Sequence, residues 1–271
     1  AGLRAVFLAT PADVSMQLAP WLMEAGAVVI DLSGAFRLRT ADNHRKWYKE
    51  EHTQPELLAK AVYGLPEFYR ERIPGAPLIS NPGCYPTAAN LAIGPLVGAG
   101  VVDRSAGIVC DAKSGVSGAG RTPKLTTHFP ECNENFSAYN VGRHRHTPEI
   151  EQTLSDLAGE PVTVIFTPHL VPMDRGIFST IYAVPKRPMT EDQVVALYRD
   201  YFADCPFIRI RTQLPTTKDT AFTNFLDLCV RVVRGRIIVL ACEDNLIRGA
   251  SGVAVQNMNR LFGFDERTAL L

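Results

Sequence analysis

Residues 27–37 read AVVIDLSGAFR, and together with the shorter apolar run RAVFLA at residues 4–9 they decide the fold of this chain. Residues 13–25 between the two runs follow a helical pattern, and Gly26 stands where a helix would stop. Both runs are apolar almost without interruption, which is typical of strands buried on both faces of a parallel sheet. The sequence therefore predicts a β-α-β unit at the start of the chain.

Three candidate binding residues follow the second of these runs. Ser33, Gly34 and Arg37 come directly after the apolar residues. Ligands bind at the carboxyl ends of strands in a parallel sheet, so these residues are well placed for a ligand. Their position alone fits ligand binding no better than it fits a simple loop, with Arg37 exposed to solvent.

Composition narrows the classes of partner. The chain has 271 residues, of which 46% are hydrophobic, and 28 Lys and Arg balance 28 Asp and Glu. This balance gives no electrostatic reason to expect nucleic acid or an anionic membrane as a partner. No apolar run approaches the roughly 20 residues of a membrane span, and no basic leader of a signal peptide precedes the first apolar run.

The six cysteines are scattered through the chain without a close pair. In a chain of this size that pattern indicates free thiols in a reducing cytoplasm rather than a disulfide framework. We expect no metal centre, because His144 and His146 are two residues apart and no Cys-x-x-Cys or His-Glu-x-x-His motif accompanies them.

The most reactive residue that the sequence offers is Cys84, in the stretch NPGCYPT at residues 81–87. An apolar run at residues 77–79 precedes this turn, and a helix-like run at residues 88–97 follows it. A cysteine at the mouth of a helix lies among unpaired N–H groups and at the positive end of the helix dipole. Both favour the thiolate, which is the nucleophilic form. We therefore expect Cys84 to form a covalent bond to a substrate, although an isolated cysteine is more often a small buried residue.

Two further segments carry polar chemistry. Residues 113–121, KSGVSGAGR, follow a strand-like run and offer many backbone N–H groups and two cations, which suits a phosphate or carboxylate, although glycine-rich loops are usually flexible surface loops. His144 and His146 precede a helix that we expect to begin near Thr147. Arginines flank both histidines and oppose their protonation, which helps to keep one of them neutral and able to act as a base.

We expect the rest of the chain to be polar surface or antiparallel sheet. Residues 40–61 are charged and predict a surface helix and loop, with His44 and His52 in solvent. Strand-like runs from residue 162 to residue 242 predict mainly antiparallel pairing, including a hairpin at residues 234–235. Residues 244–252 open a last helix whose small residues allow close approach to a ligand or to another element.

Three reaction classes fit a helix-mouth thiol combined with a histidine. They are thiol hydrolysis or amide transfer without a cofactor, acyl transfer, and interconversion of an aldehyde with an acyl phosphate through a thioester and a hydride transfer. A parallel β-α-β half followed by a mixed half favours the third class, but spacing alone does not decide among them.

Motifs along the whole chain closely resemble those of the N-acetyl-gamma-glutamyl-phosphate reductase family. They are NPGCYPT at 81–87, HRHTPEI at 144–150, DLSGAFR at 31–37, HLVPMDRG at 169–176, and DNL at 244–246 with VQNMN at 255–259. The resemblance implies α/β plus α+β architecture: a partial Rossmann parallel sheet, then a glyceraldehyde-phosphate-dehydrogenase-like mixed-sheet catalytic domain. It also implies reduction of N-acetyl-glutamyl 5-phosphate by NADPH in arginine biosynthesis. A related enzyme such as aspartate-semialdehyde dehydrogenase, or a cofactor-free Cys–His thiol hydrolase, is the alternative.

The resemblance also assigns roles to individual residues. Cys84 is similar to the family's nucleophile, and His144, with His146 as the second choice, is similar to its base. The implied contacts with NADP(H) are Ser33, Gly34, Asn245, Gly249 and Ala250. The implied contacts with the acyl phosphate are Arg37, Asn81, Ser114, Gly115 and Arg121. A cytoplasmic homodimer or homotetramer, built through the catalytic-domain sheet, is the implied assembly.

The front of the chain departs from the family pattern. No Gly-rich strand–turn–helix segment precedes Val6, so we expect the first β-α unit, with its pyrophosphate site, to be missing. Two smaller departures are Arg248 for lysine and Ser251 for alanine. The expected domains are residues 1–83 for the partial dinucleotide-binding domain, 84–243 for catalysis and oligomerisation, and 244–271 for a helix that returns to the first domain.

Overall fold

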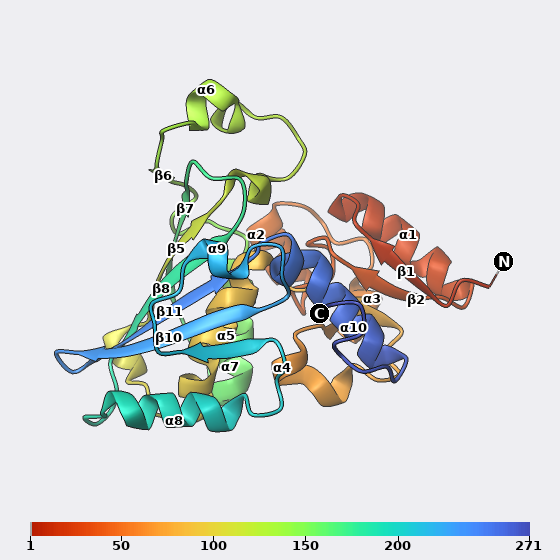
Figure 1. Cartoon of the computed structure of the whole chain (residues 1–271). Coiled ribbons are helices and arrows are strands. Elements are labelled where there is room, and N and C mark those ends of the chain that lie inside the picture. The colour runs from red at the N-terminus through yellow and green to blue at the C-terminus, as the bar shows by residue number, and fades with distance from the viewer. Residues whose placement is uncertain (1) are drawn as a thin grey trace. The chain divides into compact units, whose positions relative to one another are not determined.

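The computed structural model describes residues 2–271 and divides them into two compact units. Unit 1 comprises residues 2–83 and 250–271, and unit 2 comprises residues 84–249. Figure 1 shows the elements of both units in colours that follow the chain.

Unit 1 contains, within the described residues, a parallel sheet of four strands in the order β1-β2-β4-β3. Its strands are β1 (Ala5–Leu8), β2 (Val28–Asp31), β3 (Val62–Tyr63) and β4 (Leu78–Ser80). Helix α1 (Ala12–Glu24) connects β1 to β2, and these strands pair in parallel with Val6 opposite Val29. The predicted β-α-β unit is confirmed.

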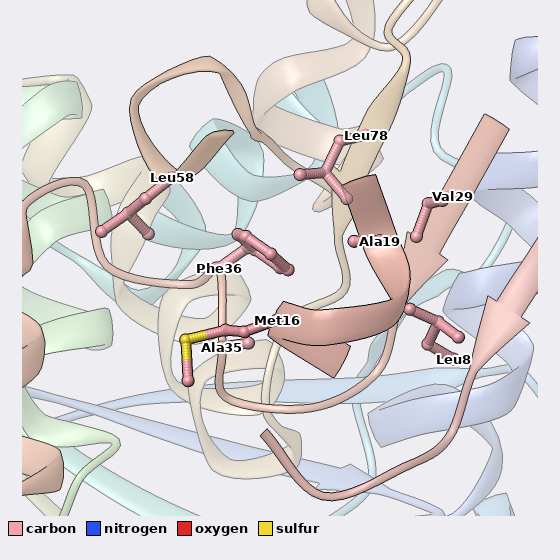
Figure 2. Close-up of a cluster of buried hydrophobic side chains, with 8 residues drawn as sticks. All are labelled: Leu8, Met16, Ala19, Val29, Ala35, Phe36, Leu58 and Leu78. Carbon is pink, nitrogen blue, oxygen red and sulfur yellow. The ribbon is translucent and has the colours of Figure 1, made fainter. Parts of the chain in front are cut away.

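Both faces of this sheet are covered, which explains why its strands are apolar without alternation. Val29 and Leu78 point to one face, where they pack with Met16 and Ala19 of α1 in the cluster shown in Figure 2. Their neighbours along β2 and β4 pack on the other face, in a cluster that includes Ala254. The remaining helices of unit 1 are α2 (Ala41–Tyr48), α3 (Pro55–Lys60), α4 (Pro66–Tyr69), the 3₁₀ turn η1 (Arg70–Arg72) and α10 (Gly252–Leu261).

The expectation that His44 and His52 are solvated is wrong. His44 is fully buried and His52 is 7% exposed. His44 stacks on Tyr48 with ring centroids 4.6 Å apart, and His52 meets Phe36 edge-on. The charged residues around them hid this packing in the sequence, because Tyr48 lies within the charged stretch itself and Phe36 precedes it.

Unit 2 contains a mixed sheet, which within the described chain has seven strands in the order β6-β7-β5-β8-β11-β10-β9. The strands are β5 (Val109–Ser114), β6 (Ser137–Ala138), β7 (Ile165–Leu170), β8 (Ile177–Ala183), β9 (Ile208–Arg211), β10 (Leu226–Val233) and β11 (Arg236–Glu243). Together with the parallel sheet of unit 1, this confirms the predicted fold class.

Helices cover one face of the mixed sheet. Helix α5 (Cys84–Gly98) packs on β8 and β11, and α7 (Thr147–Ala158) and α8 (Glu191–Tyr201) pack on α5 (Figure 1). The shorter helices are α6 (Phe129–Cys132), α9 (Thr217–Thr220), the 3₁₀ turns η2 (Arg104–Ala106), η3 (Val116–Ala119) and η4 (Leu125–Thr127), and the π-helical turn η5 (Ile247–Ser251) before α10.

The pairing in this unit is less antiparallel than the sequence predicts. The hairpin of β10 and β11 is confirmed, and β11 also pairs with β8 in antiparallel fashion. However, β7 runs parallel to β5, and β9 runs parallel to β10. Helix α7 lies between β5 and β7 in the chain, and a helical crossover brings the second strand back in the same direction.

Three general observations complete the fold. None of the six cysteines, all within residues 2–271, is in a disulfide. Over the same residues no helix is both long and apolar enough to cross a membrane. No group of three or more His, Cys, Asp and Glu side chains in the described chain is arranged to hold a metal ion.

Candidate active site

Cys84 is the first residue of α5, which confirms its predicted position at the mouth of a helix. Its side chain is partly exposed. The thiol therefore combines access to solvent with the positive end of a helix of fifteen residues. These are the two features that make a cysteine reactive.

Gly249 lies directly against Cys84. A β-carbon added to Gly249 would lie 2.7 Å from Cys84 Cβ and 3.1 Å from Cys84 Cα. The same added carbon would lie 2.8 Å from Oε1 of Glu243. Glycine is therefore required here, and the predicted close approach of this segment is to the residue that carries the thiol. We did not predict Glu243 from the sequence, because it ends a strand-like run that is otherwise apolar.

The two predicted histidines lie together and are 7% exposed each. The backbone N–H of His146 donates a hydrogen bond of 3.1 Å to Nδ1 of His144, and the ring centroids are 4.8 Å apart. Since Nδ1 of His144 accepts, its neutral ring carries the proton on Nε2. Burial, together with the charge of Arg145, lowers the pKa of His144 to about 4. His144 is therefore neutral at pH 7.

An aromatic group links the thiol to the histidines. Tyr85, which follows Cys84, meets the rings of His144 and His146 edge-on, with centroids 5.7 and 6.0 Å away. The Tyr85 hydroxyl donates to the carbonyl of His169 at 3.1 Å, and the hydroxyl of Tyr139 lies 3.2 Å from it. Burial raises the pKa of Tyr139 to about 12, and a negative charge on Cys84 would act in the same direction.

His144 therefore packs against the side chain of the residue that directly follows Cys84. We did not assign Tyr85 or Tyr139 from the sequence. The position of Tyr85 directly after the cysteine could have indicated a role in the site. Tyr139 lies in a segment without a clear helix or strand pattern, so the sequence offered no comparable indication for it.

The glycine-rich loop differs from its prediction. Its backbone N–H groups at residues 115–118 and 120 all donate to protein carbonyls, so these groups are already used within the protein. An added Cβ on Gly115 would lie 2.4 Å from the Asp174 carbonyl oxygen, so Gly115 serves close packing against the neighbouring loop. Ser114 is buried at the end of β5 and donates to the Gly115 carbonyl, whereas Arg121 is exposed.

Asn245 holds this loop in place. Its Oδ1 accepts a hydrogen bond of 2.7 Å from the N–H of Gly176, and its Nδ2 donates to the Ser117 hydroxyl at 3.0 Å. The neighbouring Asp244 forms an ion pair of 3.0 Å with Arg175. The segment before α10 thus fixes the loops at the ends of β5 and β8.

The predicted site residues of unit 1 form a second group, at the carboxyl ends of β2 and β4. Arg37 donates to the carbonyls of Leu32 at 2.7 Å and Asn81 at 2.9 Å, and Asn81 Nδ2 donates to the Ala250 carbonyl at 2.9 Å. The Ser33 hydroxyl donates to Asp31 at 2.8 Å. Arg37, which is 8% exposed, is therefore a link between strand ends rather than a solvated residue.

Some polar atoms at this strand edge form no hydrogen bond within the described chain. Ser80 Oγ at the end of β4 and Asn257 Oδ1 on α10 are buried, and neither has a hydrogen-bond partner within the described chain. Gly34 lies so close to Tyr48 that an added Cβ would be 2.4 Å from a ring carbon. The donors and acceptors of this edge fit the polar groups of a nucleotide cofactor.

Two family models match the chain. The model described as semialdehyde dehydrogenase, NAD binding domain, matches residues 1–76, and the one described as semialdehyde dehydrogenase, dimerisation domain, matches residues 84–245. The N-acetyl-gamma-glutamyl-phosphate reductase of Symbiobacterium thermophilum is 55% identical over 100% of this chain and 79% of its own length. This chain belongs to the N-acetyl-gamma-glutamyl-phosphate reductase family. The reductases of Desulforudis audaxviator and Pelobacter propionicus, at 52% and 50% identity over 98% of the chain and 78% of their own lengths, agree with this assignment.

Solved structures agree on the fold of this reductase family member. Aspartate semialdehyde dehydrogenase II from Vibrio cholerae matches with a TM-score of 0.74 and 20% identity, covering 96% of this chain and 80% of that chain. Aspartate semialdehyde dehydrogenase with NADP from Candida albicans matches with a TM-score of 0.65 and 14% identity, covering 96% and 78%.

Proposed function

We propose that this chain reduces N-acetyl-glutamyl 5-phosphate to N-acetyl-glutamate 5-semialdehyde and phosphate, with NADPH as reductant, in the cytoplasmic synthesis of arginine. Family membership supports the reaction, and the position of Cys84 at the start of α5 is the observation that supports its chemistry.

The sulfur of Cys84 attacks the acyl carbon, the bond to the phosphate oxygen breaks, and a thioester forms as phosphate leaves. A nicotinamide cofactor, when bound, supplies a hydride to the carbon of that thioester. His144 carries its proton on Nε2, so we assign it, in place of the base role that the resemblance implies, to donate a hydrogen bond to the oxygen that becomes negative, with His146 as the second candidate. The electron pair on that oxygen then re-forms the carbonyl as the carbon–sulfur bond breaks, which releases the aldehyde and restores the thiolate.

A nicotinamide cofactor belongs to the family, and we propose that it is NADP(H). Ser33, Gly34 and Ala250 at the strand edge of unit 1 are the proposed contacts there, and Asn245 and Gly249 those in unit 2. We further propose that residues 1–83 and 244–271 serve the dinucleotide, while residues 84–243 carry out the chemistry. Calorimetry with each cofactor tests the choice of NADP(H) over NAD(H). NADPH is expected to bind more tightly than NADH, and equal binding of both would contradict the choice of NADP(H).

Two groups are proposed to bind the substrate. They are Ser114, Gly115 and Arg121 in unit 2, and Arg37 and Asn81 in unit 1. Arg121 is exposed, and a guanidinium is suited to a phosphate or a carboxylate. Arg121→Gln is therefore expected to raise the KM for phosphate in the oxidative direction and leave the thiol chemistry of Cys84 unchanged. An unchanged KM would remove Arg121 from the substrate site.

We also propose a homodimer or homotetramer built through the face of the mixed sheet that α5 does not cover. On β8, side chains alternate between buried Ile177, Ser179 and Ile181 and the more accessible Phe178, Thr180 and Tyr182. The apolar and aromatic residues on the accessible side suit contact with a second copy. Light scattering is expected to give two or four copies, and a stable monomer would contradict this assembly.

The test of the function is phosphate-dependent reduction of NADP⁺ by N-acetyl-glutamate 5-semialdehyde. Cys84→Ser is expected to abolish turnover, and retained turnover would contradict the mechanism. Faster turnover with aspartate 4-semialdehyde would show instead that the chain acts as an aspartate-semialdehyde dehydrogenase. Hydrolysis of esters or amides without a nicotinamide would instead support a thiol hydrolase.

A further inference from the structure

Glu243 is a buried carboxylate in a position where the sheet otherwise has apolar side chains. On β11, Ile237, Val239 and Ala241 point to the face that α5 covers, and all three are fully buried. Side chains two residues apart in a strand point to the same face, so Glu243 continues this row. It is also fully buried. A glutamate at such a position carries a substantial desolvation cost, so its presence calls for a specific reason.

The carboxylate of Glu243 and the side chain of Cys84 both lie close to Gly249. A β-carbon added to Gly249 would lie 2.8 Å from Oε1 of Glu243 and 2.7 Å from Cβ of Cys84. Both groups therefore lie against Gly249, and only the lack of a β-carbon on that residue leaves room for them. The carboxylate of the neighbouring Asp244 accepts hydrogen bonds from Arg175 and from the backbone N–H of Phe222.

From this geometry we propose that Glu243 is a positioning residue that opposes ionisation of the Cys84 thiol and so sets the pH at which the thiolate forms. The inference rests on the proposed role of Cys84 as the nucleophile. A negative charge close to a thiol disfavours the thiolate, whereas the start of α5 favours it. Glu243 and the start of α5 therefore shift the pKa of the Cys84 thiol in opposite senses. This balance would keep the thiol from reacting indiscriminately between turnovers.

Other titratable groups lie near Cys84. Tyr85 on α5 and Tyr139 in the segment before α7 both interact electrostatically with Cys84. Arg248, which precedes Gly249, is fully buried and brings a positive charge to the same segment. Burial keeps the two tyrosines neutral at pH 7, so neither of them adds a charge near the thiol.

The test is the rate of alkylation of Cys84 by iodoacetamide between pH 5 and pH 10, followed by mass spectrometry of the peptide that contains Cys84. Glu243→Gln removes the charge at nearly constant shape, and we expect the apparent pKa of Cys84 to fall by at least about one pH unit. Glu243→Asp keeps the charge and is expected to stay much nearer the native value. Cys132, also partly exposed, is the internal control, and its profile should not move.

Should the glutamine variant fail to fold, Glu243→Met continues the apolar row of β11 and is expected to give the same downward shift. An apparent pKa of Cys84 that stays within about 0.3 units of the native value in a folded variant, whether Gln or Met, would overturn the inference. Alkylation does not require turnover, so this result is distinct from the loss of the proposed function, which Cys84→Ser tests.

Discussion

The end of strand β4 and the start of helix α5 are joined by three residues, yet their polar groups are used in different ways. In unit 1, Arg37 and Asn81 donate to backbone carbonyls and tie strand ends together. In unit 2, Cys84 begins a helix beside a glycine, and His144 is surrounded by aromatic rings. We therefore propose that unit 1 supplies a frame at its strand edge, whereas unit 2 supplies the reacting groups.

The largest expected effect comes from the glycine beside the thiol. Gly249→Ala would place a methyl group 2.7 Å from Cys84 Cβ, so the thiol must move. A displacement of about 1 Å at a reacting group costs about 100-fold in rate, and we expect at least this loss in kcat. Gly98→Ala is the matched control, because its added Cβ would meet its nearest neighbour at 3.8 Å. If the Gly249 variant kept more than half of the native kcat, the close packing would not matter for the chemistry.

Acid should destabilise the protein through His144. The pKa of His144 is about 4 in the folded chain and about 6.5 in the unfolded chain, so the unfolded chain binds a proton first as the pH falls. The stability due to neutral His144 is therefore complete above pH 6.5 and is lost progressively towards pH 4. We expect this loss to reach up to about 3 kcal/mol.

Urea unfolding of His144→Gln at pH 7 and pH 4.5 measures this effect, and the variant is expected to lose less stability over that interval than the native chain. His44→Gln is the companion in unit 1, where burial also lowers the pKa of the histidine. The exposed His128 is the control. An unchanged pH dependence in His144→Gln would contradict the prediction.

The role of Arg37 as a frame residue predicts a loss of stability without a change in thiol chemistry. Arg37→Met removes charged donors from the carbonyls of Leu32 and Asn81, which should cost about 2 kcal/mol. We expect a lower urea midpoint and an unchanged alkylation rate of Cys84. An altered alkylation profile at native stability would show that the two regions are not separate in function.

The smallest expected effect is at the aromatic link. Tyr139→Phe removes the hydroxyl that lies 3.2 Å from Tyr85, and a lost hydrogen bond of this kind costs about 1 kcal/mol. Tyr182→Phe on the accessible face of β8 is the control. If both variants were equally stable, the tyrosine pair would not contribute to holding the site.

The sequence predicted those features that depend on local pattern. Uninterrupted apolar runs predicted the parallel sheet, and the Asn-Pro-Gly turn before an apolar helix predicted the position of Cys84 at the start of α5. Features that depend on distant partners were not predictable in this way. His52 packs edge-on against Phe36 outside its own helix and loop, and Glu243 lies against Gly249, beyond the end of its strand. The hydrogen-bond acceptors of the N–H groups at residues 115–117 lie at residues 173–176, so the sequence of the loop alone did not reveal them.

The central claim is that Cys84 carries the acyl group. Mixing the protein with N-acetyl-glutamate 5-semialdehyde and NADP⁺ in the absence of phosphate should leave the thioester without its acceptor. We predict a burst of one NADPH per chain and a mass increase of one N-acetyl-glutamyl group on the peptide that contains Cys84. NADPH formation at the native rate with no acyl group on that peptide would contradict the account.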